Sequence, residues 1–253
     1  MTEPSDLSAK TCVLATDLDG TFLGGSEAAR RTLYDWIERR RDTVGLIFVT
    51  GRDPDFIQTL CREEGVPVPD YAIGDVGTTI ARVAPDCGVQ PLPALEREIA
   101  AAWGDGGARV RAALADTAGL TLQPTAFRYR VSFDLDPARL DPSAEARVTA
   151  LGYDVLVSDN RFFDVLPRGI SKGPSLLRLL DHLGVAPARC LAAGDTLNDL
   201  SMLTAGLPAV AVGGAEPALL AALPDAAGPY RATGIGAAGI TEAIAHFKLH
   251  PGI

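Results

Sequence analysis

Short apolar runs alternate with helical patterns near both ends of the chain. An apolar run at 12–15 precedes a stretch in which Leu33, Trp36 and Ile37 share one helical face. The same pattern predicts further strands at 44–49, 71–73, 190–193 and 209–212, and further helices at 54–62, 174–183, 197–203 and 240–247. Short buried strands that alternate with amphipathic helices are typical of a parallel sheet covered on both faces. We therefore expect an α/β fold with a Rossmann-like parallel sheet as its core.

The middle of the chain has a different pattern. Its predicted helices are 95–103 and 110–115, and its predicted strands are 128–135, 154–157 and 162–165. Polar and apolar residues alternate from Arg128 to Phe133, as they do in an antiparallel strand with one exposed face. We therefore predict a core made of residues 1–82 and 166–253, with residues 83–165 inserted as an α+β domain.

Charge and composition narrow the classes of partner. The 253 residues carry a formal net charge of -9 and no run rich in lysine or arginine, which argues against nucleic acid or an anionic membrane as a partner. No stretch of eighteen apolar residues occurs, and residues 1–10 are too polar for a signal peptide. We expect a cytoplasmic protein, monomeric or homodimeric. The cysteines are widely spaced and are expected to be buried free thiols: Cys12, Cys61, Cys87 and Cys190.

Residues that can carry chemistry gather in four motifs. The motifs are Asp17-Leu18-Asp19-Gly20-Thr21, Thr50-Gly51-Arg52, Ser171-Lys172-Gly173 and Gly194-Asp195-Thr196-Leu197-Asn198-Asp199. Open α/β sheets place their sites at the carboxyl ends of their strands, where these motifs lie. Asp17 and Asp19 are two residues apart, so on an extended chain both carboxylates would point the same way. The hydroxyl and backbone amides of the second motif could hold an anion.

Each motif also has a purely structural explanation, because Asp, Asn, Thr and Gly are common in turns and helix caps. Four carboxylates at one sheet edge, however, would repel each other strongly unless a divalent cation lay among them. An all-oxygen site suits Mg²⁺. Lys172 is one of only three lysines in a chain that otherwise uses arginine as its cation, which favours a specific role for it. Together the four motifs favour a functional site.

In this order, the motifs resemble the four motifs of the haloacid dehalogenase superfamily. The resemblance implies that Asp17 is a nucleophile that becomes phosphorylated and that Asp19 is the general acid and base. The implied substrate-binding residues are Thr50, Gly51, Lys172 and Asn198. The implied Mg²⁺ ligands are Asp17, Asp19, Asp195 and Asp199.

The spacing of the motifs locates the inserted domain. About thirty residues separate Asp19 from Thr50, whereas well over one hundred separate Thr50 from Lys172. The insertion must therefore lie between the second and third motifs, which in this superfamily is the position of a C2-type cap that closes over the core and supplies specificity. Phosphomutases of the superfamily usually carry the cap between the first and second motifs, so a mutase is disfavoured.

Three further segments, at 71–80, 164–173 and 237–247, resemble the sucrose-6-phosphate phosphatase group. The implied substrate is a sugar phosphate, with sucrose 6-phosphate or a related disaccharide phosphate first. Because Gly20 and Thr79 depart from the commoner pattern of that group, as does Gly169, a monosaccharide or amino-sugar phosphate is the alternative. A phosphate-binding regulatory protein is the alternative outside enzymes, and it is disfavoured because no motif residue is lost.

Several residues outside the motifs have two interpretations. Asp75 and Thr78 either line the cleft beside the motifs or belong to a turn. Arginines of the inserted domain either bind sugar hydroxyls or lie on a solvated strand face, and these are Arg128, Arg130, Arg161 and Arg168. Two tryptophans are predicted in the core and three histidines away from the site, namely Trp36, Trp103, His182, His246 and His250.

Overall fold

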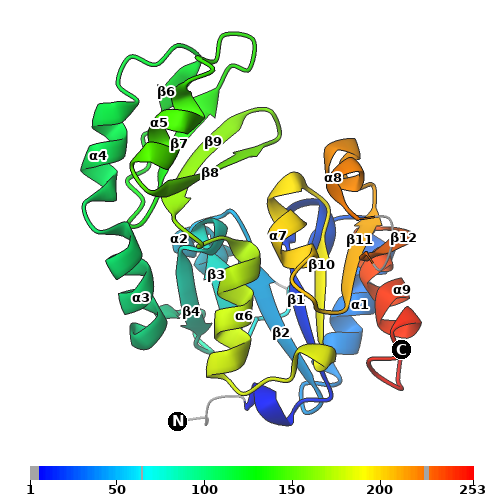
Figure 1. Cartoon of the computed structure of the whole chain (residues 1–253). Helices are drawn as coiled ribbons and strands as arrows, with labels where there is room; N and C mark the ends of the chain where they lie inside the picture. Colours follow the sequence, from blue (N-terminus) through cyan, green and yellow to red (C-terminus); the bar gives the residue numbers. More distant parts are fainter. Residues whose placement is uncertain (1–5, 64, 225–227) are drawn as a thin grey trace. The chain divides into compact units, whose positions relative to one another are not determined.

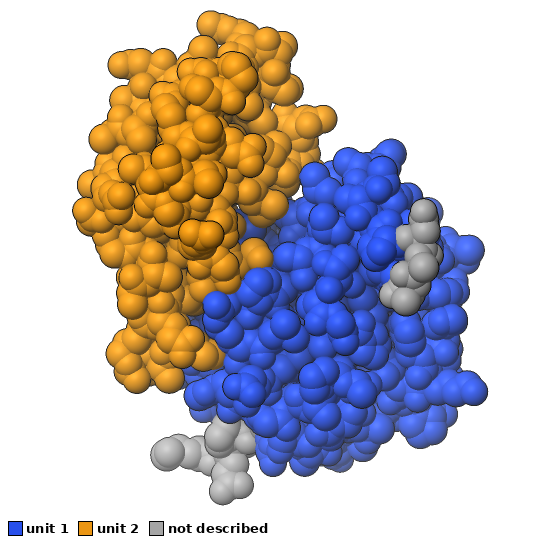
Figure 2. All heavy atoms as spheres, viewed as in Figure 1, with its two compact units in different colours: residues 1–92, 172–253 blue, residues 93–171 orange. Residues whose placement is uncertain are grey.

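The computed structural model describes residues 6–63, 65–224 and 228–253. The chain forms two compact units (Figure 2): unit 1 is Met1–Leu92 with Lys172–Ile253, and unit 2 is Pro93–Ser171. The expected boundaries, 82/83 and 165/166, lie earlier in the chain than the boundaries between these units. The first differs because two further strands pair with the core sheet before unit 2 begins, and the second because the last strand of unit 2 runs on to Pro167. Of the N-terminal segment predicted not to be a signal peptide, residues 1–5 lie outside the described residues.

Unit 1 is built on one mixed sheet. Its strands are β1 (Cys12–Thr16), β2 (Val44–Val49), β3 (Tyr71–Gly74), β4 (Thr79–Val83), β5 (Val89–Pro91), β10 (Cys190–Gly194), β11 (Ala209–Gly213) and β12 (Tyr230–Ile235). They lie in the order β12-β11-β10-β1-β2-β3-β4-β5. All pairs from β12 to β3 are parallel, as predicted, whereas β4 and β5 pair antiparallel at one edge. Every residue of the central β1 is buried, as a strand covered on both faces requires.

Helices cover both faces of this sheet. They are α1 (Glu27–Glu38), α2 (Pro54–Leu60), α6 (Lys172–His182), α7 (Leu200–Leu203), α8 (Pro217–Ala222) and α9 (Ala237–His246). Figure 1 shows α1 and α9 against one face and α6 and α7 against the other. Ser26 and Asp53 begin α1 and α2 by accepting hydrogen bonds from the backbone N–H groups of Ala29 and Phe56. The layers are those predicted from the sequence.

The register of the sheet brings the motifs together. Thr16 of β1 is paired with Phe48 of β2 on one side and with Ala193 of β10 on the other. The segments that follow these three strands hold the first, second and fourth motifs, and they therefore leave the sheet at the same edge. The backbone N–H of Asp17 donates to the carbonyl of Ala193 at 2.9 Å, which ties the first motif to the strand that carries the fourth.

Unit 2 is an α+β domain with its own core. It contains β6 (Leu120–Leu122), β7 (Val131–Leu135), β8 (Tyr153–Ser158), β9 (Phe162–Pro167), α3 (Pro93–Trp103), α4 (Gly106–Ala113) and α5 (Ala144–Ala150). The strands form an antiparallel sheet in the order β6-β7-β9-β8. The strand predicted from Arg128 begins only at Val131, the first residue that pairs with β9. The side chains of Arg128 and Tyr129 before it bond to Glu96 of α3.

The cysteines and tryptophans have the structural roles predicted for them. All four cysteines are buried free thiols, and Trp36 and Trp103 are buried in the cores of the two units. His246 stacks on Tyr230, and His250 lies edge-on to Trp36, so both rings contact other parts of the chain. Among the described residues, no helix has the length and apolar character needed to cross a bilayer.

Candidate active site

The first motif is a tight turn that follows β1. Asp17 is buried, and its carbonyl accepts a backbone hydrogen bond from the end of the turn Leu18–Phe22. Gly20 has a φ of +80°, and a Cβ there would lie 2.1 Å from Oδ2 of Asp195. Glycine is therefore needed for the close approach of the first motif to the fourth. The hydroxyl of Thr21 donates to Oδ1 of Asp195 at 2.6 Å and fixes that approach.

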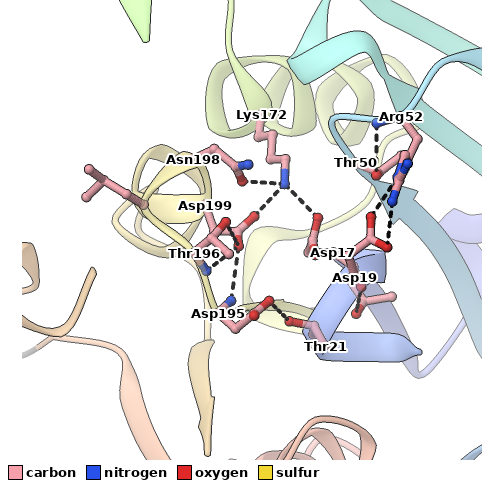
Figure 3. A network of polar contacts seen from close by, with 12 residues as sticks. Asp17, Asp19, Thr21, Thr50, Arg52, Lys172, Asp195, Thr196, Asn198 and Asp199 are labelled. Atoms are coloured by element: carbon pink, nitrogen blue, oxygen red, sulfur yellow. Dashed lines mark hydrogen bonds and ion pairs between the residues drawn. The ribbon is translucent and has the colours of Figure 1, made fainter. Parts of the chain in front are cut away.

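Lys172 lies at the centre of the site (Figure 3). Its side chain is fully buried, and Nζ donates to Oδ1 of Asp17 at 2.7 Å, of Asn198 at 2.6 Å and of Asp199 at 2.7 Å. An ammonium group has three hydrogens, so all of them are used. Desolvation alone would lower the pKa of Lys172, but the two neighbouring carboxylates raise that pKa above its usual value. Lys172 is therefore a permanent cation beside Asp17.

The fourth motif is a loop that Asp199 holds in place. Oδ2 of Asp199 accepts hydrogen bonds from the backbone N–H groups of Asp195 and Thr196, both at 3.0 Å. Gly194 ends β10 without a side chain, because a Cβ there would lie 2.5 Å from that of Asp199. The other oxygen of Asp199 accepts from Lys172. Both oxygens of this carboxylate are thus engaged in orienting the site.

Three carboxylates meet beside the lysine. One oxygen each from Asp17, Asp195 and Asp199 all lie within 4.8 Å of one another. Burial raises the pKa of Asp17 well above its usual value, although Lys172 opposes that shift. Burial also raises the pKa of Asp195 to about 6, against the hydrogen bond from the Thr21 hydroxyl. The positive charge of Lys172 therefore does not fully offset the negative charge of the three ionised carboxylates. An all-oxygen cluster of this kind fits a hard divalent cation.

Asp19 forms a separate pair with Arg52 at the same edge. Nε and one Nη of Arg52 donate to the two carboxylate oxygens of Asp19 at 2.8 and 3.1 Å (Figure 3). The carboxylate of Asp19 does not belong to the group of three, so its role as a metal ligand stays a prediction. Thr50 is buried, and its hydroxyl accepts from the backbone N–H of Arg52 at 3.2 Å, with Gly51 between the two.

The hydrogen-bonded network around the lysine joins several residues predicted from the sequence, namely Asp17, Lys172, Asp195, Asn198 and Asp199. Thr50, Gly51 and Asp19 lie at the same sheet edge without joining that network directly. Sequence reasoning missed the contributions of two side chains, those of Thr21 and Arg52. Both residues stand inside the quoted motifs, but a motif does not say where a turn residue points.

The turn Asp75–Gly77, which follows β3, supports the second motif. The hydroxyls of Thr78 and Thr79 donate back to Asp75, at 3.0 Å to its carbonyl and at 2.7 Å to its carboxylate, as the turn interpretation expects. Asp75 and Val76 have φ values of 52° and 60°, which is uncommon for any residue but glycine and strained for a β-branched one. The backbone N–H of Val76 donates to the carbonyl of Thr50 at 3.1 Å.

Two of the arginines considered for sugar binding have acidic partners within unit 2. Arg130 is buried and pairs with Asp164 at 3.4 Å, while Arg128 pairs with Glu96. Neither side chain lies on a simple solvated strand face. Two further arginines considered for sugar binding are exposed, namely Arg161 and Arg168.

The chain is similar in sequence to phosphatases of known family. The family described as sucrose-6F-phosphate phosphohydrolase matches residues 10–248. Mannosylfructose-phosphate phosphatase from Agrobacterium fabrum is 30% identical over 94% of this chain and 98% of its own length. Glucosylglycerol-phosphate synthase from Pseudomonas anguilliseptica is 38% identical over 93% of this chain, but this chain spans only 30% of that protein.

Solved structures agree with the fold. The sucrose-phosphatase from Synechocystis, determined in complex with sucrose and phosphate, matches with a TM-score of 0.83 and 28% identity over 94% of this chain and 98% of its own. A haloacid dehalogenase-like hydrolase from Bacillus subtilis matches with a TM-score of 0.70 at 15% identity over 96% of this chain and 94% of its own. Both confirm the predicted fold class. The chain therefore belongs to the sucrose-6F-phosphate phosphohydrolase family and is a phosphatase of the haloacid dehalogenase superfamily.

Proposed function

We propose that this phosphatase hydrolyses the phosphate ester of a glycoside through transient phosphorylation of Asp17, with Mg²⁺ as its cofactor. The observation that carries the proposal is the buried carboxylate of Asp17, held 2.7 Å from Nζ of Lys172 beside two further carboxylates. A carboxylate fixed next to a permanent cation is suited to attack on a negatively charged phosphoryl group.

The metal would be held by Asp17, Asp195 and Asp199. Each offers a carboxylate oxygen to one small region, and an all-oxygen donor set matches the preference of Mg²⁺. When bound, Mg²⁺ would offset the negative charge of the phosphoryl oxygens, which otherwise repel a carboxylate nucleophile. Lys172 supplies a fixed part of the same compensation, because its neighbours keep it protonated.

The residues of the chain account for both half-reactions. In the first, an oxygen of Asp17 bonds to phosphorus while the bond from phosphorus to the sugar oxygen breaks, and Asp19 gives that oxygen a proton. In the second, Asp19 takes a proton from a water whose oxygen attacks phosphorus, and the bond to Asp17 breaks to release inorganic phosphate. We assign binding of the phosphoryl oxygens to Thr50, Gly51, Lys172 and Asn198.

The names of the relatives narrow the substrate class. Sucrose, mannosylfructose and glucosylglycerol each consist of a sugar joined to a second polyhydroxy unit. We therefore propose a phosphorylated glycoside as the substrate class, with sucrose 6-phosphate or a related disaccharide phosphate as the first candidate. Glucosylglycerol phosphate is the second candidate, favoured by the 38% identity with the synthase named after it. A monosaccharide or amino-sugar phosphate is the alternative.

Phosphate release from a substrate panel tests the proposal. The purified protein with Mg²⁺ is assayed on sucrose 6-phosphate, glucosylglycerol phosphate and glucose 6-phosphate. We expect at least one glycoside to exceed glucose 6-phosphate about tenfold in kcat/KM, which requires about 1.4 kcal/mol of additional transition-state binding. Equal or faster turnover of the monosaccharide would overturn the substrate class and leave the phosphatase assignment in place.

Two controls address the mechanism. Asp17→Asn keeps the shape of the side chain but cannot form an acyl phosphate, so turnover should disappear while circular dichroism shows an unchanged fold. Activity within about tenfold of the parent would exclude Asp17 as the nucleophile. Excess EDTA should abolish turnover and added Mg²⁺ should restore it, whereas full activity in the chelator would remove the metal from the mechanism.

A further inference from the structure

Arg52 and Asp19 form a two-pronged ion pair, in which the guanidinium donates one hydrogen bond to each carboxylate oxygen. Its two hydrogen bonds, at 2.8 and 3.1 Å, use both oxygens of the carboxylate, so the guanidinium fixes the plane of the carboxyl group (Figure 3). Yet the two side chains are 50% and 57% exposed, and exposed pairs contribute little to stability. Stability therefore does not explain the geometry.

The backbone and side chain of Arg52 are both held in place. Its N–H donates to the hydroxyl of Thr50 at 3.2 Å, and its carbonyl accepts from the N–H of Asp75 at 2.9 Å. Its guanidinium carbon lies 4.6 Å from the centre of the Phe56 ring. The turn Asp75–Gly77, which is hydrogen-bonded to the loop that carries Arg52, contains Val76 in the left-handed region. Such a conformation persists only where surrounding contacts impose it. Arg52 is thus preorganised toward Asp19.

We propose that Arg52 is a positioning residue that orients the carboxyl group of Asp19 for proton transfer. The inference rests on the proposed function, in which Asp19 is the acid and base. Each carboxylate oxygen has two lone pairs, and the guanidinium uses one on each oxygen, so the second is left to carry the proton. In the first half-reaction that proton passes to the sugar oxygen as its bond to phosphorus breaks, and in the second half-reaction a proton returns from water.

A comparison of leaving groups tests this role. A sugar alkoxide is a strong base that must be protonated as it leaves, whereas 4-nitrophenolate leaves with little help. Arg52→Met should lower kcat/KM, which reports the steps through the first half-reaction, at least about thirtyfold on an alkyl substrate such as sucrose 6-phosphate, and less than about threefold on 4-nitrophenyl phosphate. Arg52→Lys should not restore the loss, because an ammonium lacks the planar fork. Arg39→Met removes another exposed arginine that is paired with an aspartate, Asp35, and should change neither rate.

A double-mutant cycle separates positioning from simple phosphate binding. In an Asp19→Asn background the acid is already gone, so Arg52→Met should cost less than about twofold more on the alkyl substrate. Additive losses, equal losses of kcat/KM on both substrates, or a rise in KM alone that Arg52→Lys reverses would show that Arg52 only binds phosphate, and would overturn the inference alone. A parent protein that hydrolyses neither substrate with Mg²⁺ would overturn the proposed function and this inference together.

Discussion

Replacing Asp195 with asparagine should stabilise the metal-free protein at neutral pH. Desolvation is the main cause that raises the pKa of Asp195 from 3.8 to about 6, and the hydroxyl of Thr21 opposes it. Asparagine has nearly the same shape and keeps an oxygen to accept the bond from Thr21, but it carries no charge. The substitution therefore removes the cost of ionising a buried group beside Asp17 and Asp199, and leaves the packing in place.

The size of the effect and its pH range follow from the pKa of Asp195. A rise from 3.8 to about 6 corresponds to up to about 3 kcal/mol, since one pKa unit is worth about 1.4 kcal/mol. A carboxyl group whose pKa is higher in the folded state contributes fully to stability below its unfolded pKa, and that contribution is lost as the pH rises through about 6. Parent and variant should therefore be similar near about pH 4, and the variant should be more stable by up to about 3 kcal/mol near about pH 7.5.

Urea unfolding in excess EDTA, followed by circular dichroism, measures both free energies. Asp42→Asn changes an exposed aspartate and should show no such pH dependence. Saturating Mg²⁺ should reverse the ranking at neutral pH, because the parent binds the cation more tightly and is stabilised by it. The reasoning fails if the asparagine variant is no more stable than the parent at neutral pH in EDTA, or if the gap persists in acid.

Three further substitutions probe other residues of the same site. Without metal, Lys172→Met should lower the free energy of unfolding by about 3–5 kcal/mol, because two buried carboxylates lose their shared cation. Urea unfolding measures this, and a loss under about 1 kcal/mol would contradict it. Gly20→Ala should cut kcat at least about tenfold, since its Cβ meets Asp195 at 2.1 Å, while Gly206→Ala, with a similar φ but open space, should leave kcat unchanged. Asp19→Ala should slow turnover of sugar phosphates about a hundredfold or more, and an unchanged rate would place the acid and base elsewhere.

The central strands of unit 1 could be predicted, but β4 and the short or half-exposed strands could not. Residues 44–49 are a continuous apolar run, and all of them are buried. β5 and β6 have only three residues each, too few for a pattern to stand out. β12 mixes half-buried and exposed residues and ends at the exposed Ile235. β4 has five residues and is largely buried, but Arg82 interrupts its short apolar run, and the boundary expected at 82/83 cuts through it.

At the site, the sequence identified the residues at the sheet edge but not the direction of every side chain. Asp17 and Asp19 were expected to point the same way because an extended chain alternates its side chains. The chain instead bends within Leu18–Phe22, where Gly20 has a φ of +80°, and Asp19 meets Arg52, 33 residues away in sequence. Such a contact depends on how β1 and β2 are paired, which residue spacing alone does not encode.

The place of Lys172 in the chain has a consequence for the order of folding. Lys172 opens α6 at the point where the chain re-enters unit 1, and it meets Asp17 from 155 residues away. Unit 2 is continuous in sequence, and its β8 and β9 form a local hairpin. Contacts between near neighbours in sequence form sooner than contacts that close long loops. We therefore expect unit 2 to become ordered before Lys172 reaches Asp17, so that the active site is completed late in folding.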